Sequence, residues 1–452
     1  MTTTSLDPAS TAQQLATAYT TNAQAQLTSK TKAAQATSTA LTKLRSSLTS
    51  FDSAIASLST KKSVIKYSAT FNTTANGTAT ASATAQPGSY SFFVEKLATT
   101  HQVAFANMTD AAETGTLGLS LADGTTFNVS FAGADADSSG QLSPAEMARA
   151  INNNADNKGS VVASVVTSGG STQLVLTSGK SGAGGAVSLN TSGLTSSTLK
   201  TQLSSGNALV PAQDAVVWLG DQTTGVRMQQ SSNTFTAVQG VSITFTKAMT
   251  TGDAPVTLTV ANDASGTASN VRSFVDAYNS LRSTLTDLTK TANKDSGTAA
   301  GAFASDASVR SMMSRLGSMV RQEVGGMKLS DFGITLDRSG QMQLDATKLE
   351  KALAAKPTGL DTLFGSASLT APSGIFGDLD KYLEQWTNSA NGQIKSRQAS
   401  VAQSQKSLTS QQTRLDTQYD NLYKRYLAQF TKLQNLQQSM GETTNLFTSL
   451  SS

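Results

Sequence analysis

The sequence predicts a multidomain α+β protein, with a coiled-coil and helical leg domain built from both termini and two β-rich head domains inserted in it. Near each end of the chain, large apolar residues recur at alternating spacings of three and four, which is typical of a coiled-coil seam. Between the ends lies a Gly/Ser/Thr-rich stretch whose apolar residues alternate as in β-strands. Because both terminal segments are predicted to be helical and the β domains lie between them in the sequence, we expect both termini to lie at one end of the molecule. This organisation is typical of assembly proteins and points away from a soluble enzyme.

The two seams are the features from which we expect assembly contacts. The N-terminal seam consists of Leu41, Leu44, Leu48, Phe51, Ile55 and Leu58. The C-terminal seam contains Leu415, Leu422, Tyr426, Phe430 and Leu433, and Leu408, Tyr419 and Met440 continue its pattern. Burying the N-terminal seam gains ~9–18 kcal/mol, which is less than the cost of ordering about twenty backbone residues at ~1–2 kcal/mol each. We therefore expect each arm to be stable only when it packs on another helix, and the two arms to be partners.

Changes in composition and period divide the chain into five regions. Residues 1–40 contain few large apolar side chains, so we expect them to be disordered until the protein assembles. The predicted regions are an N-terminal coil (1–40), a helical leg (41–66 with 267–400), a β-rich head (67–98 with 207–266), a second β-rich head with one short helix (99–206) and a C-terminal coiled-coil arm (401–452).

Within these regions, the apolar period locates individual elements. Strands are expected at residues 67–72, 90–97, 127–131, 161–167, 173–177, 214–219, 226–229, 234–238, 241–245 and 256–260. Helices are expected at residues 5–66, 144–153, 267–291, 308–324, 345–353 and from 382 to the end, with a hairpin at 333–344.

The composition excludes most enzyme chemistry. The chain has no cysteine, so disulfides, thiolate nucleophiles and cysteine-ligated metals are excluded. The single histidine, His101, leaves little room for histidine-based acid–base catalysis and is expected to be structural or exposed. No catalytic or phosphate-binding motif is complete. We therefore expect no enzymatic activity, no catalytic residues and no cofactor-binding residues.

Membrane and nucleic-acid functions are also disfavoured. No apolar run is long enough to span a bilayer, and the first residues lack the basic and apolar regions of a cleaved signal peptide. Both ends are basic and the middle is acidic, but the lysines lie apart without an aromatic stacking platform. We expect solvated helix faces, and no nucleic-acid partner or membrane insertion.

One loop resembles a calcium site. The stretch from Asp135 to Glu146 fits an EF-hand loop, with candidate ligands at Asp135, Asp137, Ser139, Gln141 and Glu146 and a glycine at the sixth position. A strand rather than a helix enters this loop, and no second hand is present to pair with it. The alternative is a capping box, because Ser143, a proline and Glu146 fit the start of a helix. Apart from this candidate calcium ion, we expect no cofactor.

Several stretches resemble the flagellar filament cap family, also called hook-associated protein type 2. The N-terminal arm "SLDPASTAQQLATAYT" and "ALTKLRSSLTSFDSAIASL" is similar to the opening helices of that family. "YSFFVEKLATTHQVA" is similar to the family's strand that ends in a Leu-Ala pair. "LSPAEMARAINNN" is similar to the Ile-Asn module that caps share with other hook-associated proteins. The most specific stretches are "AQDAVVWLG", "SNTFTAVQGVSITFTKA", "SFVDAYNSL" and "FGITLDRSGQMQLDATKLEKAL", which follow in that order.

The resemblance implies a structural cap at the tip of the bacterial flagellum, outside the cell, reached without a cleaved signal peptide. Such a protein forms a homo-oligomeric ring that promotes the folding and polymerisation of exported flagellin. Its implied partners are further copies of itself, flagellin, the hook–filament junction protein and an export chaperone. Two alternatives stay open, a hook–filament junction protein and a tip-exposed adhesin that binds host glycans. The ordered stretches from residue 212 to residue 353 disfavour the junction protein, and exposed aromatic clusters in the heads would favour the adhesin.

Overall fold

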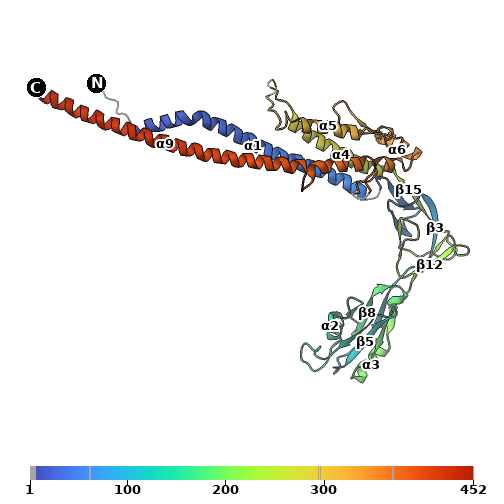
Figure 1. The fold of residues 1–452 in the computed structure, drawn as a ribbon. Coiled ribbons are helices and arrows are strands. Elements are labelled where there is room, and N and C mark those ends of the chain that lie inside the picture. The colour runs from blue at the N-terminus through green and yellow to red at the C-terminus, as the bar shows by residue number, and fades with distance from the viewer. Residues whose placement is uncertain (1–6, 61–62, 294, 296, 369–370, 451–452) are drawn as a thin grey trace. The chain divides into compact units, whose positions relative to one another are not determined.

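The computed structural model describes residues 7–60, 63–293, 295, 297–368 and 371–450. The chain divides into two compact units, one formed by residues up to Ile65 together with Ala264 onward, and the other by Lys66–Asp263. The first unit is mainly helical and the second is mainly β, as Figure 1 shows. The predicted α+β class, with helices from both ends of the chain and β domains between them, is confirmed.

Long helices dominate the helical unit, and shorter elements pack around their base. Its α-helices are α1 (Pro8–Thr60), α4 (Ala264–Thr289), α5 (Ala307–Met319), α6 (Ala346–Ala355), α7 (Gly359–Phe364), α8 (Gly374–Thr387) and α9 (Gln393–Leu450). A 3-10 turn, η2 (Leu329–Phe332), precedes a hairpin of β16 (Ile334–Leu336) and β17 (Met342–Leu344). The expected helix at 308–324 ends earlier, at Met319, where Val320 is the C-cap, and the chain then turns at Gly325 and Gly326, which both have positive φ.

The N-terminal helix α1 has two parts with different surroundings. Its second part, from Leu41 onward, packs into the base of the unit against α4 and α8. There Phe51 lies 6.0 Å from Phe274 between ring centroids, and Phe364 lies 4.7 Å from Phe376. Aromatic contacts of this kind add to the free energy that area burial alone provides.

The first part of α1 was expected to be helical, as part of a helical region at residues 5–66, and the structure confirms a helix from Pro8 that pairs with α9. The expected disorder of residues 1–40 before assembly stays a prediction. The segment contains no internal glycine or proline and is rich in alanine, which favours helix. Asp7 starts the helix by accepting a hydrogen bond from the Ala9 N–H. Residues 1–6 of the predicted N-terminal region lie outside the described residues.

The first core of the β unit lies between two antiparallel sheets. The five-stranded sheet has the order β1 (Lys66–Phe71), β15 (Val256–Asp263), β3 (Gly88–Lys96), β11 (Ala215–Leu219), β12 (Val226–Gln230). The three-stranded sheet has the order β13 (Thr234–Phe235), β14 (Val241–Phe245), β2 (Gly77–Ala81). Their inward side chains form one cluster, in which Phe245 contacts the rings of Phe92, Phe71 and Phe235.

The second core is built from residues 103–203. One sheet has the order β10 (Asn207–Val210), β4 (Thr100–Phe105), β8 (Ser171–Ser181), β7 (Val161–Ser168), and the other β6 (Thr126–Ser130), β5 (Thr116–Leu121), β9 (Val187–Asn190). Residues 99–206 were expected to hold one short helix. In that range, all of which is described, α2 (Pro144–Asn153) is joined by a second helix, α3 (Ser197–Ser204), and a 3-10 turn, η1 (Ala183–Gly185). Helix α3 forms because Ser196 caps it and Leu199 and Leu203 both reach the core.

Asparagine side chains close the outer edge of strand β7. The amide of Asn152 donates to the carbonyl of Ala163 at 2.8 Å and accepts from its N–H at 2.8 Å. Asn157 does the same at Val161. Each amide therefore takes the place of a neighbouring strand, so the polar groups of this part of the edge are satisfied.

Candidate functional site

The N-terminal seam is a structural core. Its six side chains are between 0% and 3% exposed, the most exposed being Leu58. They lie on one face of α1, and α4 and α8 cover that face. A surface that is already buried inside the unit is not available to a partner, so this seam holds the unit together rather than binding other chains.

The side chains of the C-terminal seam become more exposed along α9 toward its C-terminal end. Its first members pack against α1 and are nearly buried: Leu408, Leu415 and Leu422 are 6–9% exposed. Tyr426 and Phe430 are half-buried, and Leu433 is 41% exposed. The two helices run antiparallel, with Gln24 hydrogen-bonded to Gln412 at 3.1 and 2.9 Å.

The arm formed by α1 and α9 has a contact line that sequence reasoning missed. On α1 it consists of small residues at a spacing of four, Ala12, Ala16 and Thr20, followed by Leu27. All four are under 8% exposed, although most of the residues around them are exposed. The regular spacing of alanine and threonine was the available signal, because small residues allow two helices to approach closely.

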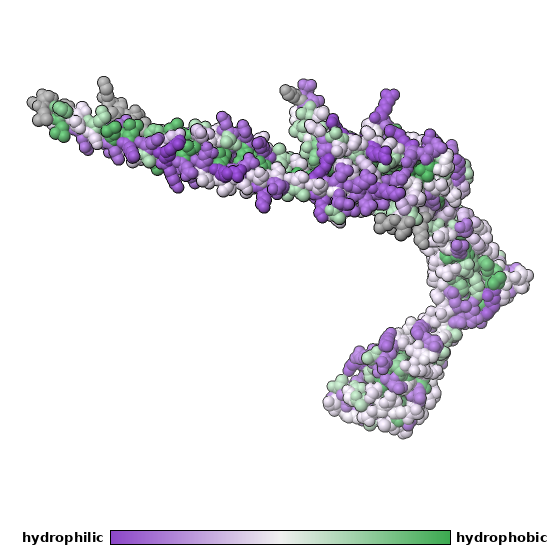
Figure 2. All heavy atoms as spheres, viewed as in Figure 1, coloured by the Kyte–Doolittle hydropathy of each residue, from purple (hydrophilic) through white to green (hydrophobic). Residues whose placement is uncertain are grey.

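Beyond the part paired with α1, α9 carries large apolar side chains with no described chain covering them. We call these the distal stripe: Leu433, Leu436, Met440, Leu446 and Phe447, which are 41–70% exposed. Figure 2 shows apolar residues gathered toward this end of the arm. On α1, Leu15 and Tyr19 are also exposed, at 40% and 64%. Exposed apolar side chains gathered on one helix are typical of interaction sites.

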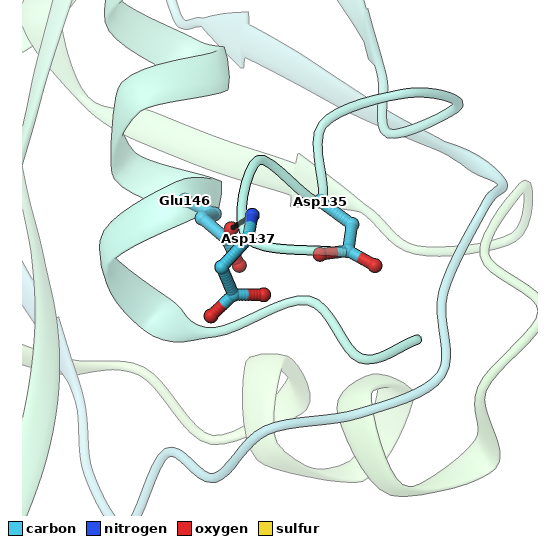
Figure 3. A group of neighbouring side chains, drawn as sticks. All are labelled: Asp135, Asp137 and Glu146. Carbon is cyan, nitrogen blue, oxygen red and sulfur yellow. Dashed lines mark hydrogen bonds between the residues drawn. The ribbon is translucent and has the colours of Figure 1, made fainter. Parts of the chain in front are cut away.

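The acidic loop lies between β6 and α2 in the second core. Figure 3 shows Asp135, Asp137 and Glu146, whose carboxylate oxygens come within 4.8 Å of one another. The Asp135 carboxylate accepts hydrogen bonds from the N–H groups of Ser139 and Gly140, at 3.1 and 2.8 Å. The side chain of Ser139 donates to the carbonyl of Gln141 at 3.0 Å. Asp135, Asp137, Ser139 and Gln141 thus lie in one turn, and Glu146 lies in the first turn of α2.

The capping box at the start of α2 is confirmed. The Glu146 carboxylate accepts from the N–H and the hydroxyl of Ser143 with one oxygen, at 2.9 and 2.8 Å. Its other oxygen accepts from the N–H groups of Ala136 and Asp137, at 2.7 and 3.4 Å. These bonds, first the one from Ser143, lower the pKa of Glu146 to about 2. Four donors occupy the lone pairs that a bidentate calcium ligand would need.

His101 is structural. The residue is 9% exposed, and its Nδ1 accepts a hydrogen bond from the Val187 N–H at 2.9 Å. Burial lowers the pKa of His101. The ring therefore joins β4 to β9 as a neutral acceptor. Within the described part of the chain, no helix combines the length and the apolar character needed to cross a membrane.

Comparison with known proteins agrees with this organisation. The family model for the flagellar hook-associated protein 2 N-terminus matches residues 4–101, and that for its C-terminus matches residues 212–442. The chain is 35% identical to the lateral flagellar hook-associated protein 2 of Vibrio parahaemolyticus over 370 residues, covering 80% of this chain and 81% of the relative. It is 27% identical to the B-type flagellar hook-associated protein 2 of Pseudomonas aeruginosa, covering 92% of this chain and 89% of the relative.

A solved structure shows the same fold over most of the chain. The crystal structure of the D1-D2-D3 domains of the flagellar cap protein FliD from Escherichia coli superposes with a TM-score of 0.63 at 27% identity. That match covers 80% of this chain and 99% of the solved one. The two family models span both ends and much of the middle of the sequence. This chain therefore belongs to the flagellar hook-associated protein 2 family.

Proposed function

We propose that this protein is the structural cap at the tip of a bacterial flagellar filament, where it promotes the folding and polymerisation of exported flagellin. The supporting observation is a two-helix arm with an uncovered distal stripe, found in a chain of the hook-associated protein 2 family. In this role the protein works through interfaces, and no catalytic step is required. The family match disfavours the two alternatives, a hook–filament junction protein and a host-binding adhesin.

The proposed partners follow from the surfaces that each partner would need. Further copies of the chain would form the cap ring. Flagellin and the hook–filament junction protein would meet the arm. Before export, a chaperone would cover the distal stripe, because exposed apolar side chains such as Leu436 and Phe447 promote aggregation inside the cell.

Partition of flagellin between medium and filament tests the cap function. A strain from which the gene is deleted should export flagellin as monomer and carry no long filaments. Expression of the intact gene in that strain should restore filaments. Normal filaments in the deletion strain would contradict the cap function. An export defect, seen as flagellin retained inside the cells, would contradict it as well.

We also propose that the acidic loop binds calcium weakly, through Asp135, Asp137, Ser139, Gln141 and Glu146. The proposal is supported by the three carboxylates that lie within 4.8 Å of one another. The existing hydrogen bonds of Glu146 predict low affinity, because the ion has to displace some of the N–H donors.

Calorimetric titration with millimolar Ca²⁺ tests this second proposal. Wild-type protein should release or absorb heat, and Glu146→Gln should bind less. Ser143→Ala is the matched control, because it weakens the helix cap by ~0.5–2 kcal/mol without removing a carboxylate. No heat from the wild type would leave the capping box as the only role of Glu146.

A further inference from the structure

The two cores of the β unit meet at a joint that is built from four segments of the chain. Residues 97–99 and 211–214 are the segments that run from one core to the other. Residues 181–183 lie at the end of β8 in the second core, and residues 231–233 lie between β12 and β13 in the first core. Contacts among these four segments determine whether the two cores can move relative to each other.

Gly182 brings the two cores into close backbone contact. Its φ is +86°, and a Cβ atom at this position would lie 2.4 Å from the Cβ of Ser231 and 2.7 Å from the Oδ1 of Asp214. Neither distance leaves room for a side chain, so any other residue would force the two segments apart. The hydroxyl of Ser181 adds a hydrogen bond across the same contact, to the Ser231 carbonyl at 2.6 Å.

The carboxylate of Asp214 is hydrogen-bonded to both cores. One oxygen accepts from the Ala183 N–H at 2.7 Å, at the start of η1 in the second core. The other accepts from the side-chain amide of Gln229 at 2.9 Å, on β12 in the first core. These bonds, first the one from Gln229, lower the pKa of Asp214. The carboxyl group is therefore ionised at neutral pH, and hydrogen bonds to an ionised acceptor are stronger than those between neutral groups.

The connecting segments are themselves held by hydrogen bonds. The N–H of Thr99 donates to the Gln213 carbonyl at 2.9 Å, and the Gln213 side chain donates to the Leu97 carbonyl at 2.9 Å. The side chain of Asn233 accepts from the Ala98 N–H at 2.7 Å and donates to the Ala98 carbonyl at 3.0 Å. Segments whose backbone groups are paired in this way lack the conformational freedom of a flexible linker.

We propose that this joint locks the two cores of the β unit into one rigid body, and that Asp214 is the residue that holds the joint closed. Gly182 permits the close approach, the Asp214 carboxylate bonds to both sides of it, and the paired connecting segments limit rotation. A force on the second core is then transmitted to the first core without bending between them. This inference uses the β unit alone and does not depend on the cap function.

The distance between two spin labels, one on each core, tests the rigidity of the joint. Because the chain has no cysteine, Val162→Cys and Val226→Cys provide the only two labelling sites on the full chain. Val162 lies on β7 in the second core and Val226 on β12 in the first, and they are 52% and 64% exposed. Double electron–electron resonance, with labelled chains diluted in unlabelled ones, should give one narrow distance distribution. A broad distribution would overturn the proposal.

Removal of the carboxylate tests the role of Asp214. Asp214→Ala in the labelled protein should widen the distance distribution about twofold, because a joint that samples several orientations has no single distance. Asp221→Ala is the matched control, since the Asp221 carboxylate accepts hydrogen bonds within its own turn, from Thr223 and Thr224. Both variants should keep the wild-type circular dichroism. An unchanged distribution in Asp214→Ala, or equal widening in the two variants, would contradict the assigned role.

Addition of a methyl group tests the close contact separately. Gly182→Ala should shift the mean distance between the labels and widen its distribution, because the new Cβ clashes with Ser231. Gly184→Ala is the control, since a Cβ there would lie 3.4 Å from the Cβ of Asp123, which is an ordinary contact. If Gly182→Ala leaves both the mean and the width as they are in the wild type, the two cores do not meet at Gly182 and the proposed joint is wrong.

Discussion

The two parts of α1 lie on one continuous helix but differ in how deeply their apolar side chains are buried and in which elements cover them. From Leu41 to Leu58, every seam residue is at most 3% exposed and is covered by other elements of its own unit. From Pro8 to Ala40, the buried positions are few and mostly small, and α9 provides the cover. The apolar surface that a helix buries in each turn determines how much its packing contributes to the free energy of folding. The first region is therefore a folded core, whereas the second is an arm with little stability of its own and surface left for partners.

Charges in the core seam should cause the largest change. Leu48→Asp with Ile55→Asp places two carboxylates where both side chains are 0% exposed, at a cost of several kcal/mol. The helical unit should lose its thermal transition, and the β unit should keep its own, as followed by calorimetry with circular dichroism. Leu433→Asp with Met440→Asp, two exposed positions of the distal stripe, is the matched control and should leave both transitions unchanged. A stable helical unit in the seam variant would contradict the division of α1.

Leucine-to-alanine substitutions, which leave a cavity, should measure the difference in packing between the core part and the arm part of α1. Leu44→Ala, in the core part of α1, should reduce the free energy of unfolding by about 3 kcal/mol. Leu27→Ala, in the arm, should reduce it by about 1 kcal/mol, because its neighbours are sparse and can collapse around it. Chemical denaturation of both variants gives the two values. Equal losses would mean that the arm is packed as firmly as the core.

The helical unit and the second β core should respond to acid in opposite directions. Burial, and then the neighbouring carboxylates Asp380 and Glu384, raise the pKa of Asp52 to about 6. The folded helical unit therefore binds a proton more tightly than the unfolded chain does, and it should gain about 1 kcal/mol as the pH falls from 7 to 5, with allowance for the half-exposed position of the group. Burial lowers the pKa of His101, so the second core should lose stability as the pH falls below about 6.5.

Scanning calorimetry between pH 7.5 and 5 checks both signs in one sample. Asp52→Asn should remove the gain of the helical unit on acidification. His101→Asn keeps an acceptor for the Val187 N–H and should remove the loss in the second core. If both transitions move in the same direction in the wild type, at least one of the two assignments is wrong.

Removal of a surface ion pair in the core region should have the smallest effect. Lys43 lies 3.6 Å from Asp287, and both side chains are more than half exposed. Lys43→Ala should change the free energy of unfolding by less than about 0.5 kcal/mol. A larger loss, measured by the same denaturation, would show that charges contribute to holding this part of α1 together with the apolar seam.

Patterned apolar residues made much of this organisation predictable. The spacing of Leu41 to Leu58 predicted a helical seam, and the structure buries every member. The capping box at Ser143 and Glu146 was also predictable, because it depends on residues within one turn. The helix at residues 8–40 was predicted as part of a helical region at 5–66. Its contact line with α9 was not predicted, since these contacts use alanine and threonine, whose side chains are too small to stand out in an apolar pattern.

Long-range pairing explains most of the remaining differences. Strand β2 reads Gly-Thr-Ala-Thr-Ala and lacks large side chains, and it is a strand because β14 pairs with it. The amides of Asn152 and Asn279 pair with the strand residues Ala163 and Met342, which lie 11 and 63 residues away in the sequence, so no local pattern reveals these contacts. Leu433 and Met440 of the distal stripe were predicted as part of a seam, but only the structure shows that α1 does not cover them.

The central claim is that the distal stripe serves assembly and contributes nothing to the fold. The most direct measurement is the partition of flagellin between medium and filament in a strain that produces only the Leu433→Asp, Met440→Asp variant, with Val226→Asp in the β unit as an exposed control. Both proteins must first be shown to reach the medium in wild-type amounts when overproduced. We predict monomeric flagellin in the medium and few long filaments for the stripe variant, and normal filaments for the control. Normal filaments with the stripe variant would contradict the account.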